Sequence, residues 1–249
     1  MSFVNRGSNG VLMYSPAQVM PNVGISLVAT ATVGANNTSE SGLRNVKFGS
    51  VSISSGRVSG ADKLLVLMGT QSTDAGAYIQ GVALGNVFQA NNEIGYRANS
   101  GGGAVAWALF DDPGTASENI SMLVANTSAN NPQATCIIYR VNNIRMTTSD
   151  LVDDGFGFTN GIGQCNTNST RGGLLIATHR DASNTDGSDI NTSNSLGWIR
   201  LTNRVAGSAY GRGVSSWYKY SSEPNDVTIQ EFWVVASANT GFWSYVSLR

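Results

Sequence analysis

The sequence predicts an all-β protein, built as one antiparallel β-sandwich of jelly-roll type that follows an extended N-terminal arm. Three observations favour this fold class. Short runs rich in Val, Ile, Leu and aromatic residues alternate with clusters of Gly, Ser, Asn and Thr along all 249 residues. No stretch of helical periodicity separates these runs, as an α/β fold would require. Hydrophobic residues make up 41% of the chain and charged residues 12%, which is enough apolar material for a sizeable core.

Residues 1–24 are expected to form the extended arm. Pro16 and Pro21 fix extended backbone and disfavour helix. The segment is nevertheless too apolar for a free tail. Its apolar side chains, the candidate protein-interaction residues, are Val11, Leu12, Met13, Tyr14, Val19 and Met20. We expect them to dock on the chain's own domain or on a neighbouring subunit, and a first strand of the main sheet is the alternative.

Residues 25–249 are expected to form a single sandwich domain, whose first strand begins at the boundary with the arm, over Gly24–Val33. In the next run, 46–53, the apolar alternation shifts by one residue at Gly49, as a β-bulge would shift it. The run KLLVLM at 63–68 is continuously apolar, which is typical of a strand buried on both faces. Further strands are expected at 78–84, 93–97, 104–110, 119–125, 135–141, 173–178, 197–202, 213–220, 227–235 and 242–248.

Turns and one long loop are expected to join these strands. The sequence DDPG at 111–114 is a strong turn signal. Residues 142–170 are the longest weakly patterned segment, which we interpret as a surface loop, with a linker between two halves as the alternative. One or two helical turns are expected near 148–154.

The two cysteines are too few for a disulfide framework. Cys136 lies in an apolar run and is expected to be a small buried hydrophobe, whereas Cys165 lies in a Gly/Asn-rich stretch. A bridge between them stays open, although a reducing site of synthesis fits better. The N-terminus lacks the basic and apolar regions of a signal peptide, and no apolar stretch approaches the ~20 residues that span a bilayer. We therefore expect cytoplasmic synthesis and no membrane partner.

The charge pattern argues against nucleic acid as a partner. The formal net charge is −1, and no basic block is present. A surface of Ser, Thr, Asn and Gly costs little to desolvate, so it suits repeated protein–protein contact. A soluble secreted β protein is the alternative on composition alone.

The sequence offers little for catalysis, and we expect neither an enzyme nor a cofactor. His179 is the only histidine, and Asp181 is too close in sequence to complete a triad with it. One histidine and two separated cysteines do not suit a structural zinc site. The oxygen-rich stretch 181–189 lacks the EF-hand spacing, so a polar turn is expected there and a calcium loop is the alternative.

The order of elements resembles the β-sandwich proteins on the virions of tailed bacteriophages. The resemblance is carried by ADKLLVL at 61–67, by AVAWALFDDPGT at 104–115, and by the strand patterns of 119–124, 134–141, 232–235 and 243–248. It covers roughly residues 25–249 in pattern more than in identity. It implies a capsid decoration (cement) protein on the outer surface of the head, in contact with the major capsid protein and with copies of itself as a homo-oligomer, expected to be a trimer. A tail fibre or baseplate protein that binds a host receptor or carbohydrate is the alternative. The resemblance defines no catalytic residue.

Overall fold

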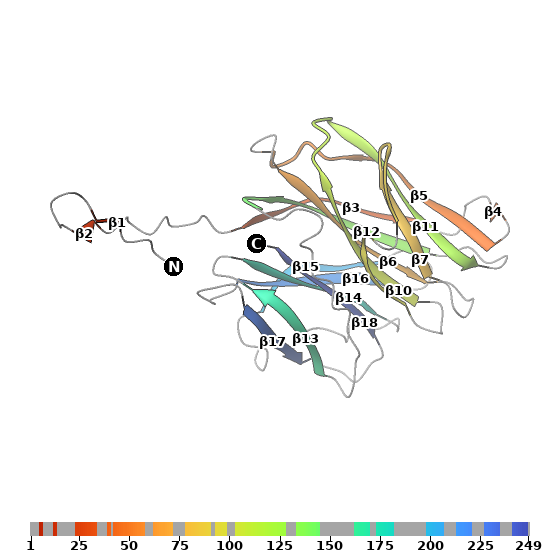
Figure 1. The fold of residues 1–249 in the computed structure, drawn as a ribbon. Coiled ribbons are helices and arrows are strands. Elements are labelled where there is room, and N and C mark those ends of the chain that lie inside the picture. Colours follow the sequence, from red (N-terminus) through yellow and green to blue (C-terminus); the bar gives the residue numbers. More distant parts are fainter. Residues whose placement is uncertain are drawn as a thin grey trace.

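The computed structural model shows an all-β chain, which confirms the predicted antiparallel sandwich class (Figure 1). The residues it describes are 5–6, 12–13, 23–33, 39–40, 42–57, 62–71, 78–90, 93–98, 103–127, 133–144, 162–169, 173–181, 198–206, 213–220, 227–234 and 241–248. Within these ranges every regular element is a strand. The expected helical turns near 148–154 lie outside them. The jelly-roll connectivity stays a prediction.

A five-stranded sheet, here called the central sheet, forms the middle layer. Its strands in spatial order are β3 (Gly24–Val33), β12 (Gln133–Asn142), β6 (Lys63–Gln71), β10 (Gly103–Asp111) and β9 (Gly95–Ala98). All neighbours pair antiparallel. β6 lies in the middle of the order and is therefore hydrogen-bonded along both edges.

A second five-stranded sheet packs on one face of the central sheet. Its order is β4 (Ser39–Glu40), β5 (Gly42–Ser52), β11 (Ser117–Thr127), β7 (Tyr78–Leu84) and β8 (Val87–Ala90). The expected bulge is confirmed, because the β5–β11 register shifts between Ile120 and Ser121, opposite Gly49. Gly49 has a φ of 82°, which glycine adopts without steric cost.

A third sheet packs on the other face of the central sheet, so the chain has three main layers (Figure 1). Its order is β15 (Ile199–Ala206), β16 (Gly213–Tyr220), β14 (Leu174–Asp181) and β18 (Gly241–Leu248). A two-stranded sheet of β13 (Ile162–Ser169) and β17 (Val227–Val234) is placed beyond it, with β13 in contact with β18. Near the N-terminus, β1 (Asn5–Arg6) pairs with β2 (Leu12–Met13).

The central sheet is apolar on both faces, because both are covered. On β6, Leu64, Val66 and Met68 face the second sheet, whereas Leu65 and Leu67 face the third. All five are fully buried, which confirms the prediction for the run at 63–68. Fully burying a Leu or Val side chain contributes roughly 1.5–3 kcal/mol. This strand is therefore a main source of stability for both interfaces.

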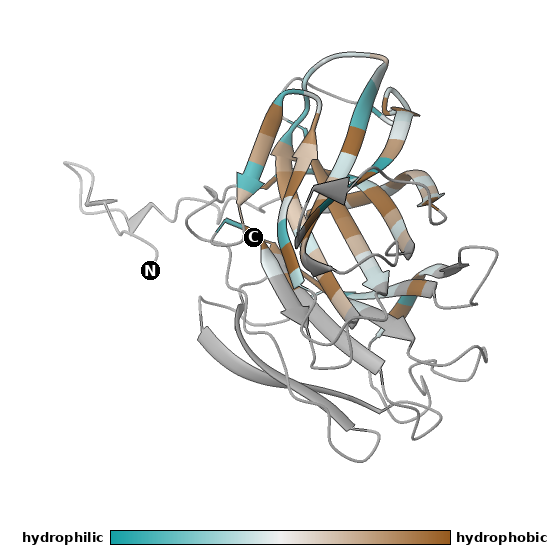
Figure 2. Cartoon of the chain, turned by 90° about the vertical axis from the view of Figure 1, so that its right-hand side faces the viewer, coloured by the Kyte–Doolittle hydropathy of each residue, from teal (hydrophilic) through white to brown (hydrophobic). Residues whose placement is uncertain are grey.

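The strands beside β6 follow the same alternation. On β10, small alanines face the second sheet, while Trp107 and Leu109 face the third. On β12, Cys136 and Ile138 face the second sheet, and Tyr139 faces the third. Figure 2 shows hydrophobic residues distributed along the strands of the part of the chain that is coloured. The sequence predicted one interface between two sheets, whereas the central sheet forms two, one with the second sheet and one with the third.

One prediction about a segment was wrong in part. Residues 142–170 were expected to be a surface loop, but β13 lies within them and pairs with β17 over its whole length. The polar sequence IGQCNTNS shows no apolar alternation. Strand formation depends strongly on the partner that a segment meets, and the apolar β17 provides that partner.

Candidate functional site

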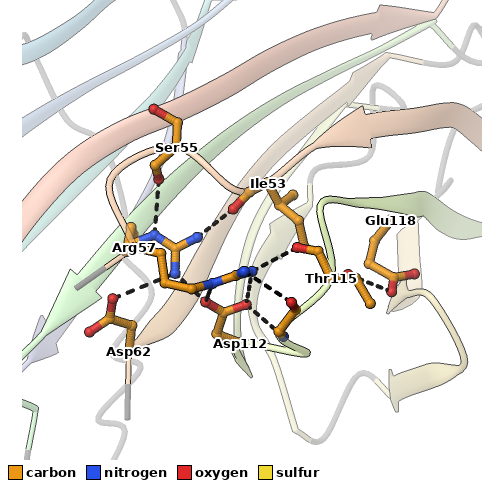
Figure 3. Close-up of polar contacts among 9 residues, drawn as sticks. Ile53, Ser55, Arg57, Asp62, Asp112, Thr115 and Glu118 are labelled. Carbon is orange, nitrogen blue, oxygen red and sulfur yellow. Dashed lines mark hydrogen bonds and ion pairs between the residues drawn. The ribbon is translucent and has the colours of Figure 1, made fainter. Parts of the chain in front are cut away.

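A cluster of four charged side chains, here called the Asp112 cluster, lies at one end of the interface between the central and second sheets (Figure 3). Its members are Arg57, Asp62, Asp112 and Arg140. Arg57 and Asp62 come from the β5–β6 connection, Asp112 from the β10–β11 turn and Arg140 from β12. Arg140 and Asp62 have no exposed side-chain surface, and the side chain of Asp112 is 1% exposed.

The Asp112 carboxylate joins two guanidinium groups. Arg57 donates from Nε to Oδ2 at 2.7 Å and from Nη2 to Oδ1 at 2.9 Å, in bidentate geometry. Arg140 donates from Nη1 to Oδ2. The backbone N–H of Gly114 also donates to Oδ1, at 3.0 Å. Through this last contact the carboxylate of Asp112 caps its own turn.

The two arginines also bind backbone carbonyls, which fixes the loops around them. Arg57 donates to Gly114 O at 2.9 Å and to Thr115 O at 2.7 Å. Arg140 donates to Ser55 O at 3.0 Å and to Ile53 O. The cluster therefore ties the β10–β11 turn to the β5–β6 connection. Its chemistry is that of a structural clamp, because both oxygens of the central carboxylate already accept hydrogen bonds.

The electrostatics of the cluster favour the ionised form of Asp112. Burial acts to raise the pKa of this carboxyl, but the hydrogen bonds from Arg57, the Gly114 N–H and Arg140 outweigh it. The result is a pKa of about 2 instead of 3.8. The same hydrogen bond with Asp112 raises the pKa of Arg57. The cluster consequently stays charged throughout the neutral and mildly acidic range.

A second buried polar group joins the central and third sheets. Tyr139 lies on β12, and its hydroxyl donates to Thr202 Oγ1 on β15. It also lies 2.6 Å from Ser216 Oγ on β16. Burial raises the pKa of Tyr139 to about 12, although both hydrogen bonds oppose this shift. These hydroxyls satisfy one another and fix how the two layers align.

The structure describes the predicted site residues only in part. Leu12 and Met13 form β2, which pairs with β1 and not with the described strands of the main sheets. Val11, Tyr14, Val19 and Met20 lie outside the described residues, and so do 182–189. The docking of the arm therefore stays a prediction.

The remaining chemistry-bearing residues are placed as follows. His179 lies on β14, where its backbone pairs with Ser215 and Trp243, and its side chain lies outside what the structure describes. Cys136 is a free thiol, and burial raises its pKa. Cys165 lies on β13 opposite Glu231. In the described ranges, no three His, Cys, Asp or Glu residues are grouped so that they could hold a metal ion.

Sequence reasoning missed the Asp112 cluster as a unit, although it singled out the turn. One signal was available, since Arg140 interrupts the otherwise apolar run at 134–141. A charge within a buried strand requires a buried partner of opposite sign. The identity of that partner depends on the strand order, which the sequence does not state.

The outer face of the second sheet, which points away from the central sheet, is partly exposed. Its central position is Leu123 on β11, which is half-buried and lies between Asn45 on β5 and Gly81 on β7. Phe88 on β8 lies over Gly81, because a Cβ at position 81 would come within 2.2 Å of the Phe88 ring. The side chains on this face include Leu43, Asn45, Lys47, Tyr78, Ala83, Phe88, Ser121, Leu123 and Ala125.

This surface is weakly charged and partly apolar. It carries the ammonium group of Lys47 and the phenol of Tyr78, and the backbone of Glu40 pairs with that of Leu43 at its edge. Leu43 is 37% exposed and Phe88 is 49% exposed. By contrast, Leu175, which points away from the central sheet on the third sheet, is buried. The second sheet thus offers a broad face that a partner could cover at a low desolvation cost.

Comparisons with family models, with curated proteins and with solved structures find no match to this chain. Within the described residues, no helix is both long and apolar enough to cross a membrane.

Proposed function

We propose that the chain is a structural component of a tailed-phage virion, a decoration (cement) protein that binds the outer surface of the capsid. In this role it contacts the major capsid protein and copies of itself, and it stabilises the shell through protein–protein contacts. The pattern resemblance of residues 61–67 and 104–115 motivates the proposal.

The observation that carries it is the outer face of the second sheet. A decoration protein needs a broad surface that it can desolvate repeatedly. This face carries Leu43, Phe88 and Leu123 beside Lys47 and small or polar residues. The layers behind it are held by two apolar interfaces and by the Asp112 cluster. Such a support keeps the face rigid, so binding costs little conformational entropy.

The test is binding to capsids that lack the protein. We expect Leu123→Lys to weaken co-sedimentation with such particles by at least about tenfold, because it places a charge at the centre of the face. The long aliphatic stem of lysine can lie along the sheet, so the fold should persist. Ile199→Lys is the matched control, since Ile199 is 53% exposed on β15 of the third sheet.

Two outcomes would contradict the proposal. Equal binding by Leu123→Lys and the unmodified protein would exclude this face as the docking surface. Binding to tails instead of heads would favour the alternative role in receptor or carbohydrate recognition.

A further inference from the structure

β8 is an exposed edge strand with an unusual distribution of free backbone groups. It forms one end of the second sheet and pairs only with β7 among the described strands. Val87 is 58% exposed and Phe88 is 49% exposed. Edge strands of this kind present outward N–H and C=O groups to which another strand can bind.

The hydrogen bonds of Ala90 show which residues of β8 turn their backbone groups away from β7. Ala90 donates its N–H to Glu93 Oε2 at 2.8 Å and accepts at its C=O from the Glu93 N–H at 2.9 Å. The N–H and C=O of Ala90 therefore point away from β7. Inward and outward positions alternate along an antiparallel strand, so those of Phe88 also point away from β7.

Among the described residues, the edge is therefore free at Phe88 and closed at Ala90. The side chain and backbone of Glu93 cover one position, and the turn at Gly85 and Asn86 ends the strand on the other side. Gln89 fixes β8 to the central sheet, because its Nε2 donates a hydrogen bond of 2.7 Å to the backbone oxygen of Leu109. Phe88 is thus the one residue of β8 whose backbone N–H and C=O both point outward without a partner among the described residues.

We propose that this edge binds the same edge of a second copy of the chain, as a two-fold pair centred on Phe88. In an antiparallel pair related by a two-fold axis, the N–H of each Phe88 donates to the C=O of the other Phe88. The same residue in both copies can therefore form both hydrogen bonds. β8 has the sequence VFQA, so no like charges meet across the axis.

The side chains fit this arrangement. Residues directly opposite each other in an antiparallel pair lie on the same face, so the two Phe88 rings become neighbours on the outer face. Val87 comes to lie opposite Gln89 of the second copy on the other face. The pairing covers the two most exposed side chains of β8, and it joins two copies of the second sheet into one continuous sheet.

This inference does not depend on the virion role, since it concerns the isolated chain. A two-fold pair produces a dimer, whereas the trimer expected from the sequence would require another face. Sedimentation equilibrium of the full chain separates these states from the monomer mass of 26.1 kDa. We expect a reversible monomer–dimer equilibrium.

The sharpest test places charges at position 88, where the two copies meet at the two-fold axis. Phe88→Lys and Phe88→Asp should each weaken self-association by at least about tenfold, because each places two like charges opposite one another. An equimolar mixture of the two variants should associate again. Ile199→Lys is the control, and it should behave as the unmodified chain does. Far-ultraviolet circular dichroism should confirm that all variants fold.

A monomer at every concentration up to about 1 mM, the weak end of specific affinities, would overturn the proposal. So would a trimer whose mass is unchanged by the Phe88 substitutions, or a mixture of the Lys and Asp variants that stays monomeric.

Discussion

Asp112→Asn should destabilise the protein far more than the same substitution at the neighbouring position. Asn keeps the shape of the side chain but removes the charge that faces Arg57 and Arg140. It also turns an amide donor toward groups that can only donate. Arg140 has no exposed side-chain surface, so water cannot replace the lost acceptor.

The magnitude follows from two estimates. The pKa of Asp112 falls from 3.8 to about 2, and each pKa unit corresponds to about 1.4 kcal/mol, which gives about 2 kcal/mol. Removing one partner of a buried ion pair costs about 3–5 kcal/mol in other proteins. We therefore expect Asp112→Asn to lower the free energy of unfolding by about 2–4 kcal/mol at pH 7.

The dependence on pH has a defined sign. Because folding lowers the pKa of Asp112, its contribution is complete above the unfolded value of 3.8 and is lost as the pH falls toward about 2. The Asn variant does not titrate in this range. The difference in stability between the two proteins should therefore shrink as the pH falls from about 5 to about 2.

Urea unfolding monitored by tryptophan fluorescence is the assay, since Trp107 and Trp217 are buried. Asp111→Asn is the matched control. Asp111 is 88% exposed and pairs with Lys63 at 2.5 Å, so its loss should cost less than about 1 kcal/mol. Equal effects of the two substitutions at pH 7 would refute the reasoning, as would a difference that grows at low pH.

Two further predictions concern the layers and the arm. Tyr139→Phe should lower the free energy of unfolding by about 1–3 kcal/mol, since it leaves Thr202 and Ser216 without their shared partner; thermal denaturation measures this. Because folding raises the pKa of Tyr139 to about 12, its contribution to stability is present below pH 10 and should be lost as the pH rises from there toward 12, a loss that the Phe variant should not share. Deleting residues 1–22 should leave the sheets folded, because the truncated chain keeps Val23, which is buried next to β3. The same deletion should weaken attachment to particles. Attachment at full strength would exclude the arm as an anchor, and loss of folding would show that the arm belongs to the core.

Local patterns predicted much of the fold. The strand at Gly24–Val33 and the bulge at Gly49 follow from local side-chain patterns, and the doubly buried run at 63–68 follows from its unbroken apolar sequence. β13 was missed because its residues do not alternate, and its pairing with β17 joins segments that are far apart in the chain.

The third layer and the Asp112 cluster were beyond prediction for a related reason. A strand at 63–68 that is buried on both faces must be packed against a layer on each face, but the sequence does not say which strands form those layers. Arg140 and Asp112 are separated by 28 positions, and they meet only because β12 and β10 both flank β6. Such contacts depend on strand order, which the apolar pattern leaves open.

Quantitative mass spectrometry of purified virions tests the central claim most directly. A decoration protein should be present in a copy number comparable to that of the major capsid protein. A few copies per particle, or its absence from the particle, would contradict the account.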